Sequence, residues 1–345
     1  MNKKHEFIPL FRKFISDGYD GKRLSCNGSR IRKQSIDNYV TCLNLVIAFQ
    51  TKRGEIIYIL EAAGNNQRSH QRLKKYYKSF HKCLSQFLFQ DRNCHDNYVG
   101  LIFKQIKAFF KWLNRELGIN TGFYYLSFYT MRQEIPVFTL SIAQLRFLMF
   151  DKEFENSLPN ILQQCKDVLV FGCLVGLRYS DLLKLSALNI QTVEGVVYLK
   201  VLSQKTRTYT SVKLPPSALL IIEKYRKNKT RILPCKSLCV FNQHIKEIAF
   251  NAGWTYPLMN YRTKRGVEDI KGKQKSRFCD MISSHIMRRT CITIMLTSGI
   301  PELVVKKVSG HSNNSKSFFR YVNFAQEIMD SEIDKMHRNF EACVR

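Results

Sequence analysis

Five side chains in the second half of the chain have types that suit chemistry on an anion. The segment GLRYSDL contains Arg178, SSHIMRRT contains His285 and Arg288, and VSGHSNNSKSFFRYVNF contains His311 and Tyr321. Guanidinium groups stay charged and bind oxyanions, imidazoles move protons near neutral pH, and an activated phenol can act as a nucleophile. Each residue type is also common as a surface charge, a helix cap or core filling. Their meaning therefore depends on the elements that hold them.

The segment SSHIMRRT predicts a helix that begins at Ser283 or Ser284. His285 and Arg288 then lie three residues apart just inside the helix, and this spacing places both side chains on one face. The pair is expected to act at the same place.

The other residues lie at the ends of predicted helices. In PELVVKKVSGH, Pro301 suits a helix start and Gly310 a helix end, which places His311 at a fixed helix terminus. Arg178 lies in a tight connection before SDLLKL, a helix for which Ser180 is the expected N-cap. A guanidinium in such a connection can be accessible to a ligand rather than buried in the core.

The series GLRYSDLLKL, Lys205 in a hairpin turn, SHIMRRT, SGH and Tyr321 resembles the catalytic-domain signature of the tyrosine recombinase family, the integrases of phages and mobile elements. The resemblance covers Phe138 to Phe324 by ordered motifs. Before that it rests on architecture, because family members carry a helical core-site-binding module ahead of the catalytic domain. One spacing differs from the family, since Tyr321 follows His311 by ten residues where most members have nine.

The resemblance implies that Tyr321 is the nucleophile and forms a 3′-phosphotyrosyl intermediate with DNA, leaving a free 5′ hydroxyl. The arginines would clamp the phosphate oxygens, which gain charge in the transition state. Lys205 would protonate the leaving 5′ oxygen, and Asp181 would orient its neighbours. Neither a metal ion nor ATP is expected, so the implied cofactor list is empty. The implied catalytic set is Arg178, Lys205, His285, Arg288, His311 and Tyr321, with Asp181 in support.

The net charge makes a polyanion the expected partner. The chain has 345 residues and a formal charge of +28, from 55 Lys and Arg against 27 Asp and Glu. Residues 1–137 and 138–345 have excesses of +13 and +15, so a ligand running along both halves, double-stranded DNA, fits best. The candidate DNA-binding residues lie in two basic segments: Arg72, Lys74, Lys75, Arg262, Lys264, Arg265, Lys273 and Lys275.

Hydrophobic periodicity divides the chain into two domains. Apolar residues at helical spacing predict four or five helices in residues 1–126, an all-α, SAM-like core-binding domain by the resemblance. Residues 127–139, with Pro136, read as a linker. Residues 140–345 predict a mainly α catalytic domain with a small β-sheet (α+β), because VVYLKV and TSVKL alternate as the strands of a hairpin. A helix over about 158–174 should end at Gly176, with further helices over 217–227 and 243–252.

A predicted tail helix from about Ala325 has Ile328, Met329, Ile333 and Met336 on its apolar side. In the family such a tail commonly docks on a neighbouring protomer, which implies a homotetramer on DNA. Packing on its own domain is the alternative. Accessory DNA-bending or directionality factors are further possible partners.

Composition argues for a cytoplasmic protein with no membrane partner. The longest apolar run is far shorter than a membrane span, and the N-terminus lacks the apolar region of a signal peptide. Eleven cysteines favour reduced thiols. Two His and Cys clusters lack the ligand spacing of a zinc finger or ribbon, so no metal site is expected. The clusters are His81, Cys83, Cys94 and His95, and Cys235, Cys239 and His244.

Several activities share these motifs. Besides an integrase, the same chemistry serves an invertase, a resolvase of chromosome dimers and a relaxing topoisomerase. A relative that has lost catalysis and only binds DNA is the alternative from a different class.

Overall fold

The computed structural model describes residues 3–25, 27–62, 67–203, 208–227, 231–234, 236–258, 262–268, 276–312, 315 and 318–342. The chain forms two compact units. Unit 1 comprises Met1–Ile135 with Tyr261–Lys273, and unit 2 comprises Pro136–Asn260 with Gln274–Arg345. The fold is mainly helical with small antiparallel sheets, which confirms the predicted class. In the described part of the chain, no helix is both long and apolar enough to cross a membrane.

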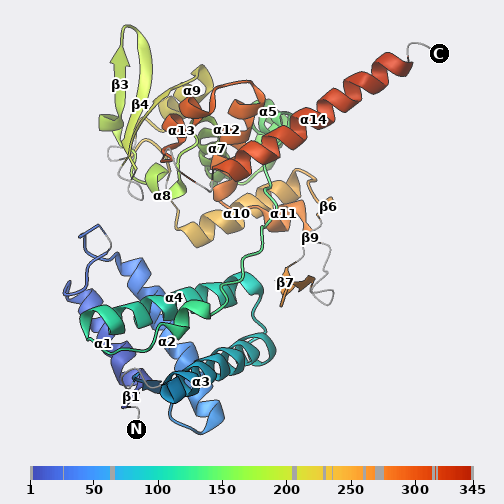
Figure 1. Cartoon of the computed structure of the whole chain (residues 1–345). Coiled ribbons are helices and arrows are strands. Elements are labelled where there is room, and N and C mark those ends of the chain that lie inside the picture. The colour runs from blue at the N-terminus through green and yellow to red at the C-terminus, as the bar shows by residue number, and fades with distance from the viewer. Residues whose placement is uncertain are drawn as a thin grey trace. The chain divides into compact units, whose positions relative to one another are not determined.

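Unit 1 is a helical module built around aromatic side chains (Figure 1). Phe7 and Phe11 project from its first helix, and their rings lie 5.0 and 4.6 Å from the ring of Phe109 on the fourth. Such pairs bury large apolar area and prefer tilted or edge-to-face geometry. The helices are α1 (Phe7–Tyr19), α2 (Lys33–Arg53), α3 (Gln67–Gln86) and α4 (Asp96–Glu116), followed by a 3₁₀ turn, η2 (Tyr124–Ser127).

Two short antiparallel pairs complete unit 1. Strand β1 (Lys4–Glu6) pairs with β2 (Tyr58–Leu60), a ladder that helical periodicity did not predict. Strand β7 (Thr263–Lys264) pairs with β8 (Val267–Glu268) in a hairpin whose turn contacts the first residue of α4. The buried carboxylate of Asp96 accepts hydrogen bonds from the backbone N–H groups of Arg265 at 2.7 Å and Gly266 at 2.9 Å. This carboxylate therefore fastens a distant segment to α4.

Unit 2 is organised around the contact between α7 (Asn160–Val175) and α12 (His285–Thr297). Helix α7 ends at Gly176, whose φ of +69° is the left-handed conformation expected of a C-terminal glycine. Gly172 lets the two helices approach closely, because a Cβ placed there would lie 2.2 Å from Sδ of Met287. The start of α12, which carries His285 and Arg288, is thereby positioned against the core.

A three-stranded antiparallel sheet and peripheral helices surround this pair. Val201 pairs with Thr210 and Leu199 with Val212, so the predicted hairpin is confirmed, and a strand before it is added. The strands are β3 (Ile190–Val193), β4 (Val196–Leu202) and β5 (Tyr209–Lys213), after the 3₁₀ turn η3 (Ala187–Asn189). The remaining elements are α5 (Ile142–Phe150), α6 (Lys152–Ser157), α8 (Tyr179–Leu182), α9 (Pro216–Lys224), α10 (Leu238–Asn251), β6 (Pro257–Leu258), β9 (Ser276–Arg277), α11 (Phe278–Met281), α13 (Glu302–Ser309) and α14 (Phe319–Ala342).

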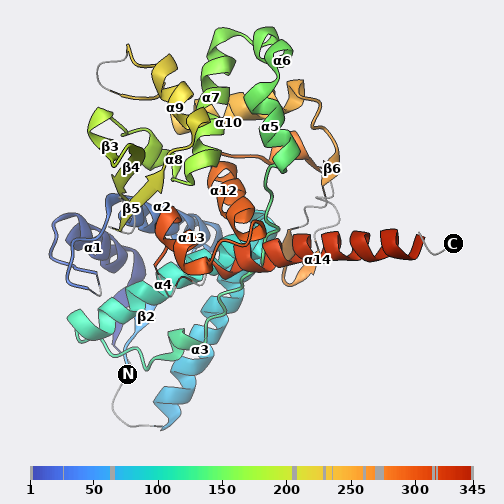
Figure 2. The ribbon, with the colours of Figure 1, turned by 90° about the horizontal axis from the view of Figure 1, so that it is seen from above.

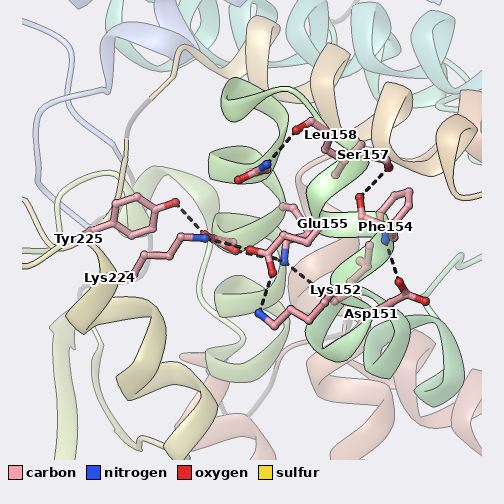
Figure 3. Close-up of polar contacts among 12 residues, drawn as sticks. Asp151, Lys152, Phe154, Glu155, Ser157, Leu158, Lys224 and Tyr225 are labelled. Atoms are coloured by element: carbon pink, nitrogen blue, oxygen red, sulfur yellow. Dashed lines mark hydrogen bonds and ion pairs between the residues drawn. The ribbon is translucent and has the colours of Figure 1, made fainter.

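An ionic cluster joins α6, α7 and α9 beside the core (Figure 3). Lys166 is almost completely buried and lies 3.4 Å from carboxylate oxygens of both Glu155 and Asp167. Lys224 bridges the same two carboxylates at 3.0 and 2.7 Å, and the hydroxyl of Tyr225 donates to Asp167. Because the buried lysine is paired on several sides, the cluster holds α7 in place without an uncompensated charge.

Two predicted boundaries are wrong. Ser180 does not cap α8, since the helix begins at Tyr179 and its N-cap is Arg178 with extended backbone. The tail is not a separate helix, because α14 runs without interruption from Phe319 through Tyr321 to Ala342. Its last turns extend away from the rest of unit 2 in both views (Figures 1 and 2). The nucleophile candidate and the tail thus belong to one rigid element.

Candidate active site

One pocket of unit 2 brings together five of the residues predicted from the sequence. Its volume is about 310 Å³. The lining residues come from segments that are far apart in the sequence, namely the segment before α5, the turn before α8, the start of α12, the end of α13 with the residues after it, and the start of α14. They are Val137, Arg178, His285, Arg288, Arg289, His311, Ser312, Ser315, Arg320 and Tyr321.

Arg288 is the fixed centre of this pocket. Its side chain is 1% exposed, and its guanidinium donates hydrogen bonds to the carbonyl oxygens of Gly176 and Ser309. Its other terminal nitrogen lies 3.0 Å from Nδ1 of His311. The C-terminal ends of α7 and α13 therefore meet on one arginine, which orients His311.

Arg178 is held by a second set of contacts. Its Nη1 donates to Oγ of Ser203 at 2.8 Å and lies 4.0 Å from Oδ2 of Asp181. Asp181 is 3% exposed, and it accepts a hydrogen bond from Ser203 at 3.4 Å. The carboxylate therefore orients the arginine directly and through the serine hydroxyl.

Tyr321 lies in the first turn of α14 with its hydroxyl oxygen 3.3 Å from Nε2 of His285. The residue is 6% exposed, and its ring packs in a small apolar cluster with Ile292, Val305 and Phe318. The ring is fixed by this packing, while the hydroxyl reaches the polar pocket. A phenol beside an imidazole has a proton acceptor within reach.

The pocket concentrates positive charge away from water. Burial, followed by the charge of Arg178, lowers the pKa of Arg288 to about 10, so that this group stays charged at neutral pH. Burial and the neighbouring arginines lower the pKa of His311 to about 3, so that this imidazole is neutral. Burial also lowers the pKa of Arg178. Desolvated cations facing one small cavity form a site for an oxyanion such as a phosphodiester.

Two arginines in the pocket were not predicted. Arg289 and Arg320 both line it, and the charge of the Tyr321 phenol opposes the larger lowering of the Arg289 pKa by burial. A signal for Arg289 was present, because it lies four residues after His285 and therefore near the same helix face. Arg320 precedes Tyr321, and no sequence pattern distinguished it.

The other predicted residues fall outside this pocket. Arg72, Lys74 and Lys75 are exposed on α3, and Arg262 and Arg265 are exposed in or beside the β7–β8 hairpin. Lys74 and Arg265 line a hollow of about 880 Å³ in unit 1. Lys264, by contrast, is half-buried and bonded to Asn93. Lys205, Lys273 and Lys275 lie outside the described residues.

Residues 156–327 match the phage integrase family. The chain belongs to this family of tyrosine recombinases, and its activity is site-specific DNA recombination. The match spans every residue of the pocket except Val137. No curated protein sequence matches the chain.

Several solved structures share the fold of this chain over most of its length and most of their own. A lambda integrase fragment (residues 75–356 of that protein), crystallised as a dimer bound to a COC′ core site, is 14% identical with a TM-score of 0.58, over 92% of this chain and 95% of that one. A variant fragment of the Tn1549 transposon integrase (residues 82–397 of that protein) in complex with transposon right end DNA is 14% identical with a TM-score of 0.59, over 97% of this chain and 99% of that one. The XerH recombinase bound to a palindromic difH substrate is 13% identical with a TM-score of 0.56, over 94% of each chain.

Proposed function

We propose that the protein is the integrase of a mobile element or phage, and that Tyr321 cleaves DNA to form a 3′-phosphotyrosyl link. The observation that carries the proposal is the position of the Tyr321 hydroxyl, 3.3 Å from His285 and in one pocket with Arg178 and Arg288. A phosphodiester in this pocket would meet a nucleophile, a proton acceptor and two phosphate-binding cations together.

In the proposed step, the Tyr321 oxygen attacks phosphorus, an O–P bond forms, and the phenol proton passes to His285. The bond from phosphorus to the 5′ oxygen breaks, and that oxygen takes a proton to leave as a 5′ hydroxyl. We assign this proton to Lys205, which lies outside the described residues. Arg178 and Arg288 hold the non-bridging oxygens, and neutral His311 contributes a hydrogen bond.

The reverse step rejoins DNA. Because the phosphotyrosyl link keeps the phosphoester bond, a 5′ hydroxyl from another duplex can attack it and release the tyrosine. The proposed cycle therefore balances without ATP, and the charge stabilisation that it requires is assigned to arginines rather than to a metal ion.

We assign DNA binding to both domains predicted from the sequence, residues 1–126 and 140–345, with residues 127–139 as linker. Arg72, Lys74 and Lys75 on α3 supply phosphate contacts in the first domain, and Arg262 and Arg265 of the later basic segment supply more. Binding that neutralises many phosphates releases counterions. The affinity should therefore fall steeply with salt concentration.

We propose that four copies act together on two duplexes, held by the tail of α14. Met329, Ile333 and Met336 are exposed and follow helical spacing, which gives this helix an apolar stripe. The lambda integrase structures with DNA include a dimer and a tetramer bound to a Holliday junction, which supports assembly on DNA. We place this complex in the cytoplasm, where accessory DNA-bending or directionality factors can reach it.

A nicked suicide substrate tests the chemistry. The nick lies close to the cleavage point, so that the short fragment diffuses away and the covalent complex accumulates. Wild-type protein should give a protein–DNA adduct on a denaturing gel, attached at Tyr321 by peptide mapping, and Tyr321→Phe should give none. An adduct at another residue, or no adduct on a bound site, would contradict the proposal. Plasmids with paired sites then separate integration from inversion and resolution.

A further inference from the structure

Arg289 lines the pocket that holds the reacting oxygen of the proposed mechanism. It follows Arg288 on α12, but the two side chains have different surroundings. Arg288 is buried and bonded to the carbonyls of Gly176 and Ser309. Arg289 is half-buried and lines the pocket together with Tyr321. It lies four residues after His285, whose Nε2 is 3.3 Å from the phenol oxygen, and therefore near the same face of α12. A guanidinium has only donors, so it can act on the phenol oxygen only by donating to it.

We propose that Arg289 is a further catalytic residue, which acts on the nucleophile and not on the phosphate. As the Tyr321 oxygen forms its bond to phosphorus and its proton moves to Nε2 of His285, the guanidinium holds the negative charge that develops on the phenol oxygen. In rejoining, the same bond stabilises the phenolate as the phosphorus–tyrosine bond breaks. The inference rests on the proposed function, because it assigns a role within that reaction.

The contacts of the other cations favour this division of roles. Arg178 is bonded to Ser203 and lies near Asp181, while Arg288 is bonded to backbone carbonyls and His311. Both of these arginines are directed by other partners, whereas Arg289 lies near the face of α12 that carries His285 beside the phenol. Arg320 from α14 also lines the pocket.

The chemistry needs such a group. An ordinary phenol has a pKa near 10, so little of it is ionised at neutral pH. A donor aimed at the developing oxyanion typically accounts for about 10²- to 10³-fold in rate. Burial lowers the pKa of Arg289, yet an arginine beside a phenol oxygen keeps its proton at neutral pH.

The test uses the full-length protein, the nicked substrate and single-turnover rates between pH 6.5 and 9.5. Arg289→Gln should slow covalent-complex formation about 100-fold at pH 7. The defect should shrink as the pH rises, since hydroxide then supplies more phenolate. Arg289→Lys, which keeps a charge without the planar donor geometry, should show a smaller loss. Arg226→Gln removes one exposed arginine elsewhere in unit 2 and is the matched control.

Two modified substrates separate the nucleophile from the phosphate and the leaving group. A methylphosphonate at the cleavage point removes the phosphate charge, so it should relieve Arg178→Ala and Arg288→Ala but not Arg289→Gln. A 5′-bridging phosphorothiolate supplies a leaving group that needs no acid, and it should also leave the Arg289→Gln defect in place. Rescue by either substrate would overturn the assignment.

An unchanged rate for Arg289→Gln, with wild-type protein forming the Tyr321 adduct, would overturn this inference and leave the proposed function intact. Absence of the wild-type adduct would instead contradict the proposed function. Thermal unfolding and DNA affinity should match wild type for Arg289→Gln, Arg289→Lys and Arg226→Gln. If Arg289→Gln fails to fold, the pH profile of Arg289→Lys decides, and a uniform loss at every pH would count against the proposal.

Discussion

The terminal nitrogen of Arg288 lies 3.0 Å from Nδ1 of His311, at the meeting point of α12 and the end of α13. The same guanidinium nitrogen lies 3.1 Å from Nε2, and because a guanidinium can only donate, the ring nitrogen that it bonds must accept. An imidazole that accepts at this position is neutral. This geometry agrees with the pKa of His311, which burial and the nearby charges of Arg288, Arg178, His285 and Lys306 lower to about 3.

The depressed pKa of His311 predicts a loss of stability in acid. Below about pH 6.5 the unfolded histidine gains a proton that the folded one does not bind, so the free energy of unfolding falls as the pH drops from 6.5 toward 3. His311→Asn removes this contribution. The variant should therefore lose less stability than wild type over this range, by about 0.5 to 1 kcal/mol per pH unit for a partly exposed ring.

Denaturant unfolding at pH 7.5, 6.0 and 5.0 measures the difference. Parallel pH profiles for the two proteins would show that His311 titrates normally in the folded state.

The buried hydrogen bonds of Arg288 predict a structural cost for a conservative change. Arg288→Lys keeps a charge, but a single ammonium group cannot donate to the carbonyls of Gly176 and Ser309 and to His311 at the same time. At least one buried carbonyl therefore loses its hydrogen-bond donor. The free energy of unfolding should fall by about 2 to 3 kcal/mol. Denaturant unfolding checks this value, with exposed Arg146→Lys as the control. A loss no greater than that of the control would mean that the carbonyl contacts add nothing to stability.

The close approach of α7 and α12 predicts a strong coupling between two positions. Gly172→Ala would place a methyl group 2.2 Å from Sδ of Met287 and should cost about 1 to 3 kcal/mol of stability. Met287→Ala opens space at the same point, so the double variant should be more stable than the sum of the single effects predicts. A double-mutant cycle by denaturant unfolding gives the coupling, and simple additivity would refute the clash.

The buried carboxylate of Asp96 predicts how the β7–β8 hairpin is held. Asp96→Ala removes the acceptor for the N–H groups of Arg265 and Gly266, and it should destabilise unit 1 by about 1 to 3 kcal/mol. Asp96→Asn keeps one acceptor and should lose less. Hydrogen exchange of those two amides should accelerate in both variants. The control is Asp91→Asn, because Asp91 is more exposed than Asp96 and forms an ion pair with Lys52. Equal exchange rates of the two amides in wild type and all three variants would show that Asp96 does not hold the hairpin.

Local patterns in the sequence predicted those features of the fold that depend on neighbouring residues. Gly176 ends α7 because only a residue without Cβ adopts φ of +69° without strain. Alternation in VVYLKV and TSVKL predicted a hairpin, and the structure sets its register by pairing Val201 with Thr210. Ser180 failed as a cap because the preferences of capping residues are weak beside the tertiary contacts that hold Arg178 in extended backbone.

By itself, the sequence determined the residue types of the pocket and their order, because both can be read directly from the motifs along the chain. Only the tertiary structure decided what each group experiences there. The burial of Arg288, the neutrality of His311, the approach of the Tyr321 hydroxyl to His285 and the attachment of the β7–β8 hairpin to Asp96 all depend on residues from separate elements. Desolvation and hydrogen bonding depend on distances through space, and separation along the chain does not specify those distances.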